Sequence, residues 1–252
     1  MKRNKQFGKG SIRAGKFLVL AVLGVWFVLT AVDSLAHNLW IVGDADGKGK
    51  GTIHLYFEHW VGPGDGAYNA PIVKHGKTWV KTPQGEPVPV SMKEVTVKDT
   101  KFLVGNSGKV SGSYGIDHVS IYGIYHGQLD FFHGRYIKAT DAKSLADLSE
   151  SSNVPVQIVP ALTEKGLLIR VLYFSTPQPR VNVWLVKEDG TEESFMTNQK
   201  GELFIGPVEP GTSHIVTRII ENEPAGAYEH EAYKGVMHGS TLTLKLTEDF
   251  QK

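Results

Sequence analysis

The four residues Ser34, Leu35, Ala36 and His37 have the types and order of a signal-peptide cleavage site followed by a metal ligand. Small residues at positions 34 and 36 match the pattern that signal peptidase reads. Cleavage after Ala36 would make His37 the first residue of the mature protein. Its α-amino nitrogen and its ring Nδ1 could then bind the same cation. The stretch therefore predicts a metal chelate at the new N-terminus.

The segment before this stretch has the organisation of an export signal. Six basic residues and no acidic residue lie within the first 16 positions, and residues 17–32 form one uncharged apolar run. This run is shorter than the ~20 residues that span a membrane in a relaxed helix. We therefore expect residues 1–36 to be a cleaved signal peptide and the protein to be periplasmic or otherwise exported. The alternative is an inner-membrane anchor formed by uncleaved residues 17–32.

Charge and cysteine content narrow the classes of function. Removal of residues 1–36 leaves 21 Lys and Arg against 25 Asp and Glu, a net charge of about −4. A mildly acidic protein has no electrostatic reason to bind nucleic acid. The absence of cysteine excludes disulfides, thiolate zinc sites and cysteine nucleophiles.

The residues after His37 read as a β-hairpin that would hold a second histidine beside the first. Residues 39–42 form a short apolar run, and residues 52–60 alternate so that Ile53, Leu55, Phe57 and His59 share one face. His59 ends that face just before a loop rich in glycine and proline. It can be a packed structural residue or a ligand at the mouth of the fold. If the two strands pair, His59 is the best partner for His37.

A second group of histidines is less well defined. His126, Asp130 and His133 lie close together in the sequence, and residues 127–134 read more simply as a hairpin with a polar tip than as a ligand cluster. His126 stays a candidate ligand on this local pattern alone.

The remainder predicts an all-β protein made of two antiparallel β-sandwich domains. Short strands every 8 to 12 residues favour this class over any α/β fold. We expect an N-terminal β-rich domain over residues 37–140, a linker over 141–152, and a C-terminal immunoglobulin-like sandwich over 153–252, where about seven strands fit into 100 residues.

Four stretches together resemble the family called domain of unknown function 4198. They are Ala-His-Asn-Leu-Trp at 36–40, Glu-His-Trp-Val-Gly-Pro-Gly at 58–64, residues 156–185, and AYKGVMHGSTLTL at 232–244. The resemblance implies an exported bacterial β protein linked with nickel or cobalt uptake components, and it carries ligand positions onto His37, His59 and His238. Asn38 departs from the acid expected after the first histidine, so one charged ligand is missing.

The predicted function is therefore transition-metal binding in uptake or delivery, beside a membrane transporter component. Ligands made only of nitrogen favour Ni(II) and Cu(II) with tetragonal geometry, and zinc stays open if Glu58 or a third imidazole completes a tetrahedron. The chain lacks the G-x-S-x-G, P-loop and H-E-x-x-H motifs, so we expect no enzyme; copper polysaccharide monooxygenases, which also begin with histidine on a β-sandwich, share nothing further with it. The rival prediction is a structural or adhesion module that binds protein or glycan without metal.

Overall fold

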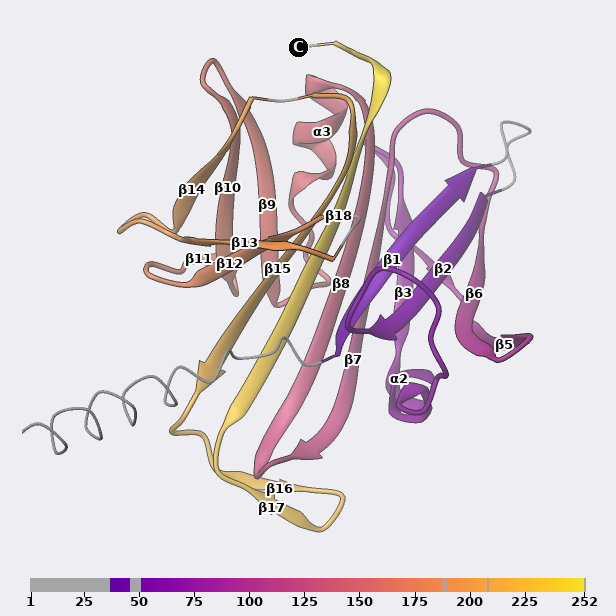
Figure 1. The fold of residues 1–252 in the computed structure, drawn as a ribbon, viewed down its shortest axis with the longest axis vertical. Coiled ribbons are helices and arrows are strands. Elements are labelled where there is room, and N and C mark those ends of the chain that lie inside the picture. The colour runs from indigo at the N-terminus through magenta and orange to yellow at the C-terminus, as the bar shows by residue number, and fades with distance from the viewer. Residues whose placement is uncertain (1–36, 46–50, 188–189, 208, 252) are drawn as a thin grey trace, which may run out of the picture. The chain divides into compact units, whose positions relative to one another are not determined.

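A computed structural model describes residues 37–45, 51–187, 190–207 and 209–251 (Figure 1), and the chain from His37 onward forms one compact unit. Strands make up 63% and helices 7% of the structure, which confirms the predicted all-β class. The predicted signal peptide, residues 1–36, lies outside the described residues. Within the described ranges, no helix has the length and apolar character needed to cross a membrane.

The N-terminal sheet is built on the predicted hairpin. Strand β1 (Asn38–Ala45) pairs with β2 (Gly51–Glu58) in antiparallel register, with Leu39 opposite Phe57. Strands β6 (Thr100–Gly108) and β5 (Lys93–Val97) complete the order β1-β2-β6-β5. The alternation read from the sequence is confirmed, because Ile53, Leu55 and Phe57 are all buried.

A central sheet of eight strands draws on both halves of the chain. Its order is β13 (Glu192–Met196), β12 (Asn182–Val186), β15 (Gly211–Glu221), β18 (Val236–Gln251), β8 (Gln128–Asp141), β7 (Tyr114–Tyr125), β3 (Lys77–Lys81) and β4 (Val88–Val90). Strands β18 and β8 lie side by side at its middle (Figure 1) and pair in parallel, whereas the other pairs are antiparallel.

A third sheet consists of β9 (Val156–Thr163), β10 (Gly166–Tyr173), β14 (Glu202–Gly206) and the short β11 (Thr176–Pro177). It packs on one face of the central sheet, and the N-terminal sheet packs on the other. Alternate residues of β8 serve the two cores: Tyr136 packs with Leu39 and Leu55, while Ile137 packs with Ile158 and Ile169. The period of two along a strand thus explains how one sheet supports two layers.

The structure corrects the predicted division into two domains, because residues 37–252 form one unit. Strands β8 and β18, one from each predicted domain, share one ladder from Leu129 paired with Val236 to Ala139 paired with Leu246. A sequence pattern locates strands but does not say which strands pair across long separations, so two runs of β signals looked like two domains. The immunoglobulin-like topology expected for residues 153–252 stays a prediction.

The predicted linker is a packed helix, α3 (Ala142–Ser149). Asp141 and Ser144 form a capping box at its start, which satisfies free backbone N–H groups. Leu145 and Leu148 are buried in the core beneath the third sheet. The helix was predicted as a linker because residues 141–152 are mostly polar and contain only two leucines.

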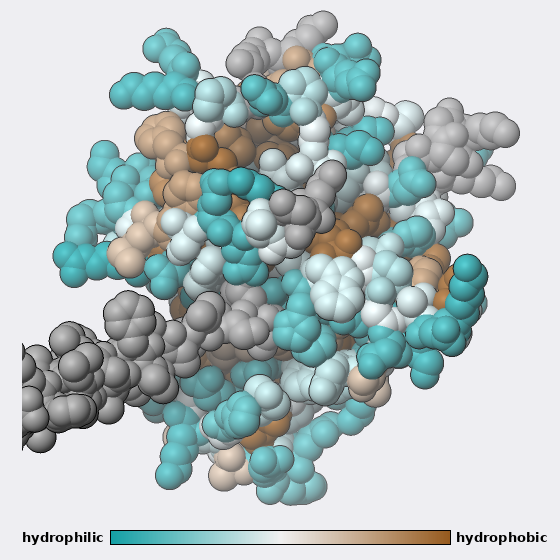
Figure 2. Space-filling model, in the orientation of Figure 1, coloured by the Kyte–Doolittle hydropathy of each residue, from teal (hydrophilic) through white to brown (hydrophobic). Residues whose placement is uncertain are grey.

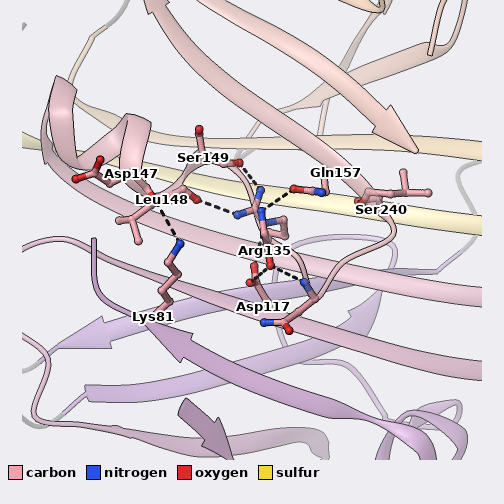
Figure 3. Close-up of polar contacts among 11 residues, drawn as sticks. Lys81, Asp117, Arg135, Asp147, Leu148, Ser149, Gln157 and Ser240 are labelled. Atoms are coloured by element: carbon pink, nitrogen blue, oxygen red, sulfur yellow. Dashed lines mark hydrogen bonds and ion pairs between the residues drawn. The ribbon is translucent and has the colours of Figure 1, made fainter. Parts of the chain in front are cut away.

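A buried ion pair fixes the end of α3 to the central sheet (Figure 3). The Arg135 guanidinium donates to Asp117 Oδ1 at 2.9 Å and to the carbonyls of Leu148 and Ser149 at 2.9 and 2.6 Å. The second Asp117 oxygen accepts from the Ser151 hydroxyl. Both charged side chains are more than nine-tenths buried. Such a pair is tolerated because hydrogen bonds satisfy its charged atoms.

Three small elements were not predicted from the sequence. Helix α2 (Asn69–His75) follows the glycine-rich loop, and a two-stranded ribbon is formed by β16 (Gly226–Tyr228) and β17 (Glu231–Tyr233). His75 contacts this ribbon through the Tyr228 hydroxyl, at 3.2 Å from its Nε2.

Candidate functional site

The register of β1 and β2 brings His37 and His59 together. Asn38 pairs with Glu58, so the next residues outward, His37 and His59, face each other across the hairpin. Their ring centroids are 4.3 Å apart. This is the proximity that the hairpin prediction required. We call these two residues, with Glu58, the rim site.

Aromatic rings and a carboxylate surround His37. Its ring lies 5.5 Å from that of Phe57 and 4.5 Å from that of Tyr68, and its Nε2 is 4.0 Å from Glu58 Oε2. Burial lowers the pKa of His37, and repulsion from His59 lowers it further, while Asp65 acts in the opposite direction. At neutral pH the His37 ring is therefore neutral and can offer a lone pair to a cation.

The loop after β2 shapes the carboxylate of Glu58. Burial raises the pKa of Glu58, as does the nearby Asp65, whereas a hydrogen bond from the Gly66 backbone N–H opposes the rise. A Cβ atom at Gly64 would overlap the Glu58 carboxylate, so only glycine fits there without displacing it. The Gly64 carbonyl also accepts from the Lys101 N–H at 2.8 Å, which ties the loop to β6. The loop thus holds Glu58 against the two histidines.

The structure places the other two predicted ligands elsewhere. His238 is buried on the face of the central sheet beneath the third sheet, where its neighbours are His133 and Tyr173. His37 lies in the layer that covers the opposite face. His126 is exposed in the two-residue turn between β7 and β8, at φ 50°, with its ring 4.1 Å from that of Tyr125. Residues 128–134 belong to strand β8, so the turn precedes them at 126–127, and Asp130 and His133 are buried in the strand instead of forming a polar tip.

The side chains of the rim site supply only part of a metal coordination shell. Over residues 37–45, 51–187, 190–207 and 209–251, no three His, Cys, Asp or Glu side chains have positions that could hold a metal ion together. A full shell at the rim site would need the His37 α-amine, or small rotations of the rings and of Glu58.

A groove of about 730 Å³ opens on the other side of the same loop. Four aromatic or imidazole side chains line it, Tyr56, Trp60, Tyr136 and His214, together with the loop residues 61–63. Trp60 is 53% exposed, so its ring surface is available to a ligand. Figure 2 shows apolar surface among polar side chains on the face where β1 and the loop lie.

Sequence reasoning missed Tyr173, Glu221 and the hydrogen-bonding role of His133. These residues gather around His238 from positions 17 to 105 residues away in the chain. No local pattern marks such a cluster, because three separate strands supply its partners.

Comparison with known proteins adds no relative: no protein-family model matches the chain, and no curated protein matches it.

Proposed function

We propose that this protein is an exported transition-metal-binding protein and that the rim site, completed by the α-amine of a mature N-terminal His37, holds the ion. The observation that carries the proposal is the pairing of His37 with His59 immediately after the expected cleavage position. An N-terminal histidine supplies two nitrogen donors, and His59 supplies a third. The resemblance to the domain of unknown function 4198 family, with its link to nickel and cobalt uptake, belongs to the same proposal.

The chemistry of the donors favours Ni(II), Co(II) or Cu(II) over Mg²⁺ or Ca²⁺. Imidazole and amine nitrogens bind the later transition metals, whereas Mg²⁺ and Ca²⁺ prefer oxygen ligands. Glu58 adds one carboxylate whose charge would offset that of the ion. A site at the edge of two layers can load and release an ion, so delivery to or from a membrane transporter component is the proposed role.

Isothermal titration with Ni²⁺, Co²⁺, Cu²⁺ and Zn²⁺ tests the proposal on protein that begins at His37. A preformed chelate of three nitrogens should bind at least one of these ions more tightly than ~10 μM. Absence of any binding at that level would overturn the proposal. Mass spectrometry of exported material establishes independently whether the chain begins at His37.

Two variants separate the donors. One extra residue before His37 removes the amine chelate but leaves both rings in place, so affinity should fall by at least tenfold. His59→Asn removes one imidazole and should cause a comparable loss. Equal affinity in the extended protein would exclude the terminal amine as a ligand.

The second candidate function is glycan binding in the groove beside Trp60. The observation that favours it is the exposed Trp60 ring at the side of a groove large enough for a small ligand. Titration with oligosaccharides, with Trp60→Ala as the negative control, distinguishes this function from the first. Glycan binding that is lost in Trp60→Ala and needs no metal would favour the adhesion-type module.

A further inference from the structure

Three side-chain atoms that could bind a metal lie close together, and one of them is Nε2 of His238. Its Nε2 is 3.2 Å from the Tyr173 hydroxyl and 3.6 Å from Glu221 Oε1, and the hydroxyl donates to that same oxygen at 2.5 Å. Residues 173, 221 and 238 belong to β10, β15 and β18. The cluster thus lies where the third sheet meets the central sheet.

The triangle formed by these atoms has the size of a metal coordination face. A circle through its three corners has a radius of about 1.8 Å, less than the ~2.0–2.2 Å bonds that zinc makes to imidazole nitrogen and carboxylate oxygen. An ion just above the plane of the triangle would therefore contact all three atoms with little side-chain movement. The Glu221 side chain is 36% exposed, which leaves a path for an ion and for water ligands.

The His238 ring is held in a fixed orientation. It is 95% buried, and the Phe131 ring stacks on it at 5.0 Å with an interplanar angle of 20°. Its other nitrogen, Nδ1, lies 3.0 Å from His133 Nε2. In the tautomer in which His238 Nδ1–H donates to His133 Nε2, the His238 Nε2 carries a lone pair that an ion can use, as in metal-binding imidazoles whose second nitrogen donates a hydrogen bond.

We propose that His238 Nε2, Tyr173 Oη and Glu221 Oε1 form a second cation site that takes ferric iron. One imidazole, one phenolate and one carboxylate make a donor set with more oxygen than nitrogen, and this set differs from the nitrogen-rich rim site. Binding forms an Fe–O bond to Tyr173 and releases the phenolic proton to solvent. The charges of the phenolate and of the Glu221 carboxylate then face the ion directly. This site does not rest on the proposed function of the rim site.

The phenol of Tyr173 stays protonated until a cation arrives. Burial raises the pKa of Tyr173 to about 12, and the hydrogen bond to Glu221 contributes to the rise. Because one proton leaves for each ion bound, affinity should fall about tenfold for each unit of lowered pH.

The test adds ferric nitrilotriacetate to the full chain and records the visible spectrum, because an iron-bound phenolate has a charge-transfer band that neither free iron chelate nor free tyrosine shows. We expect the band in the wild-type protein and its complete loss in Tyr173→Phe, which keeps the ring and removes only the donor oxygen. Glu221→Gln should weaken iron binding by at least tenfold. Absence of the band in the wild type, or a band that persists in Tyr173→Phe, would overturn the proposal and leave the cluster a hydrogen-bonded chain.

Two further variants serve as controls for the iron experiment. If Tyr173→Phe does not fold, as judged by circular dichroism, Glu221→Gln decides: unchanged iron affinity in it contradicts the site. His59→Asn alters the rim site only, so it should keep the charge-transfer band. Failure of nickel or copper binding at the rim would therefore leave the iron result unaffected, and the two proposals fail separately.

Discussion

Two pairs of histidines in this protein lie in opposite environments. His37 and His59 have ring centroids 4.3 Å apart at the edge of the N-terminal sheet, and the His37 side chain is 24% exposed. His133 and His238 have ring centroids 5.3 Å apart inside the protein and share a hydrogen bond of 3.0 Å. Burial is the main cause of the lowered pKa of both His37 and His133, and repulsion from the neighbouring histidine adds to it in each pair; the more deeply buried His133 has its pKa lowered to about 3.

The difference shows how similar residues acquire different roles. At the rim, a neutral histidine beside Glu58 retains solvent access, which the proposed metal site requires. In the interior, a polar atom left without a partner costs free energy, and the two closest pairs of buried ionisable groups, His133 with His238 and Arg135 with Asp117, are hydrogen-bonded to each other. The same comparison predicts which changes should unfold the protein and which should only alter its ligand.

Removal of the Arg135 side chain should have the largest effect. Arg135→Met would leave the Asp117 carboxylate buried without its charge partner and two carbonyls of α3 without donors. The free energy of unfolding should fall by about 3–5 kcal/mol, measured by urea denaturation with an unchanged m-value. The double variant Arg135→Met with Asp117→Leu should recover part of this loss, because no unpaired charge remains. A loss below about 1 kcal/mol would show that the ion pair is not needed to hold α3.

Acid should destabilise the folded protein through its buried histidines. Burial lowers the pKa of His118 and His133 to about 3 and that of His214 to about 4. In the unfolded chain these groups bind protons below pH ~6.5. Stability is therefore fully present above that pH and is lost as the pH falls toward 4. Asp130, whose pKa burial raises to about 7, acts oppositely, since its folded form takes up a proton first.

The two contributions together leave roughly two more protons on the unfolded chain near pH 5, so the free energy of unfolding should fall by roughly 3 kcal/mol per pH unit there. Urea denaturation at several pH values between 7 and 4 measures this slope. His133→Gln removes one of the extra protons of the unfolded chain, so it should lower the slope by about 1.4 kcal/mol per pH unit. A slope near zero would contradict neutral, buried histidines.

A change in the loop tests the rim alone. Gly64→Ala would force the Glu58 carboxylate away from its place beside His37, because the new methyl group would occupy that space. We expect a loss of about 1–3 kcal/mol in stability and weaker metal binding by titration. Gly62→Ala is the matched control, since its Cβ would lie 3.3 Å from the nearest Trp60 atom and would leave Glu58 in place. Equal metal affinity in both variants would remove Glu58 from the site.

The sequence predicts the strands and the rim site well because both depend on local pattern. Alternation located β2, its short partner located β1, and antiparallel pairing then fixed His37 opposite His59. The central sheet was not predictable in the same way, since Val236 pairs with Leu129 across more than 100 residues of chain. The Tyr173 and Glu221 cluster depends on that long-range pairing. Leu145 and Leu148 signalled one apolar helix side, but the polar residues around them dominated the segment.

The smallest effect is expected at His126, which belongs to neither histidine pair. Its backbone at φ 50° precedes Gly127 at φ 79° in a two-residue turn between paired Tyr125 and Gln128, a geometry in which asparagine is favoured. His126→Asn should therefore change the free energy of unfolding by less than about 0.5 kcal/mol, with any change toward stability. Metal affinity should stay within twofold of wild type, whereas His59→Asn, which makes the same replacement at the rim, should lower it at least tenfold. If the two variants lost affinity equally, the ion would not discriminate between an exposed turn and a preorganised pair, and the assignment of metal binding to the rim would be wrong.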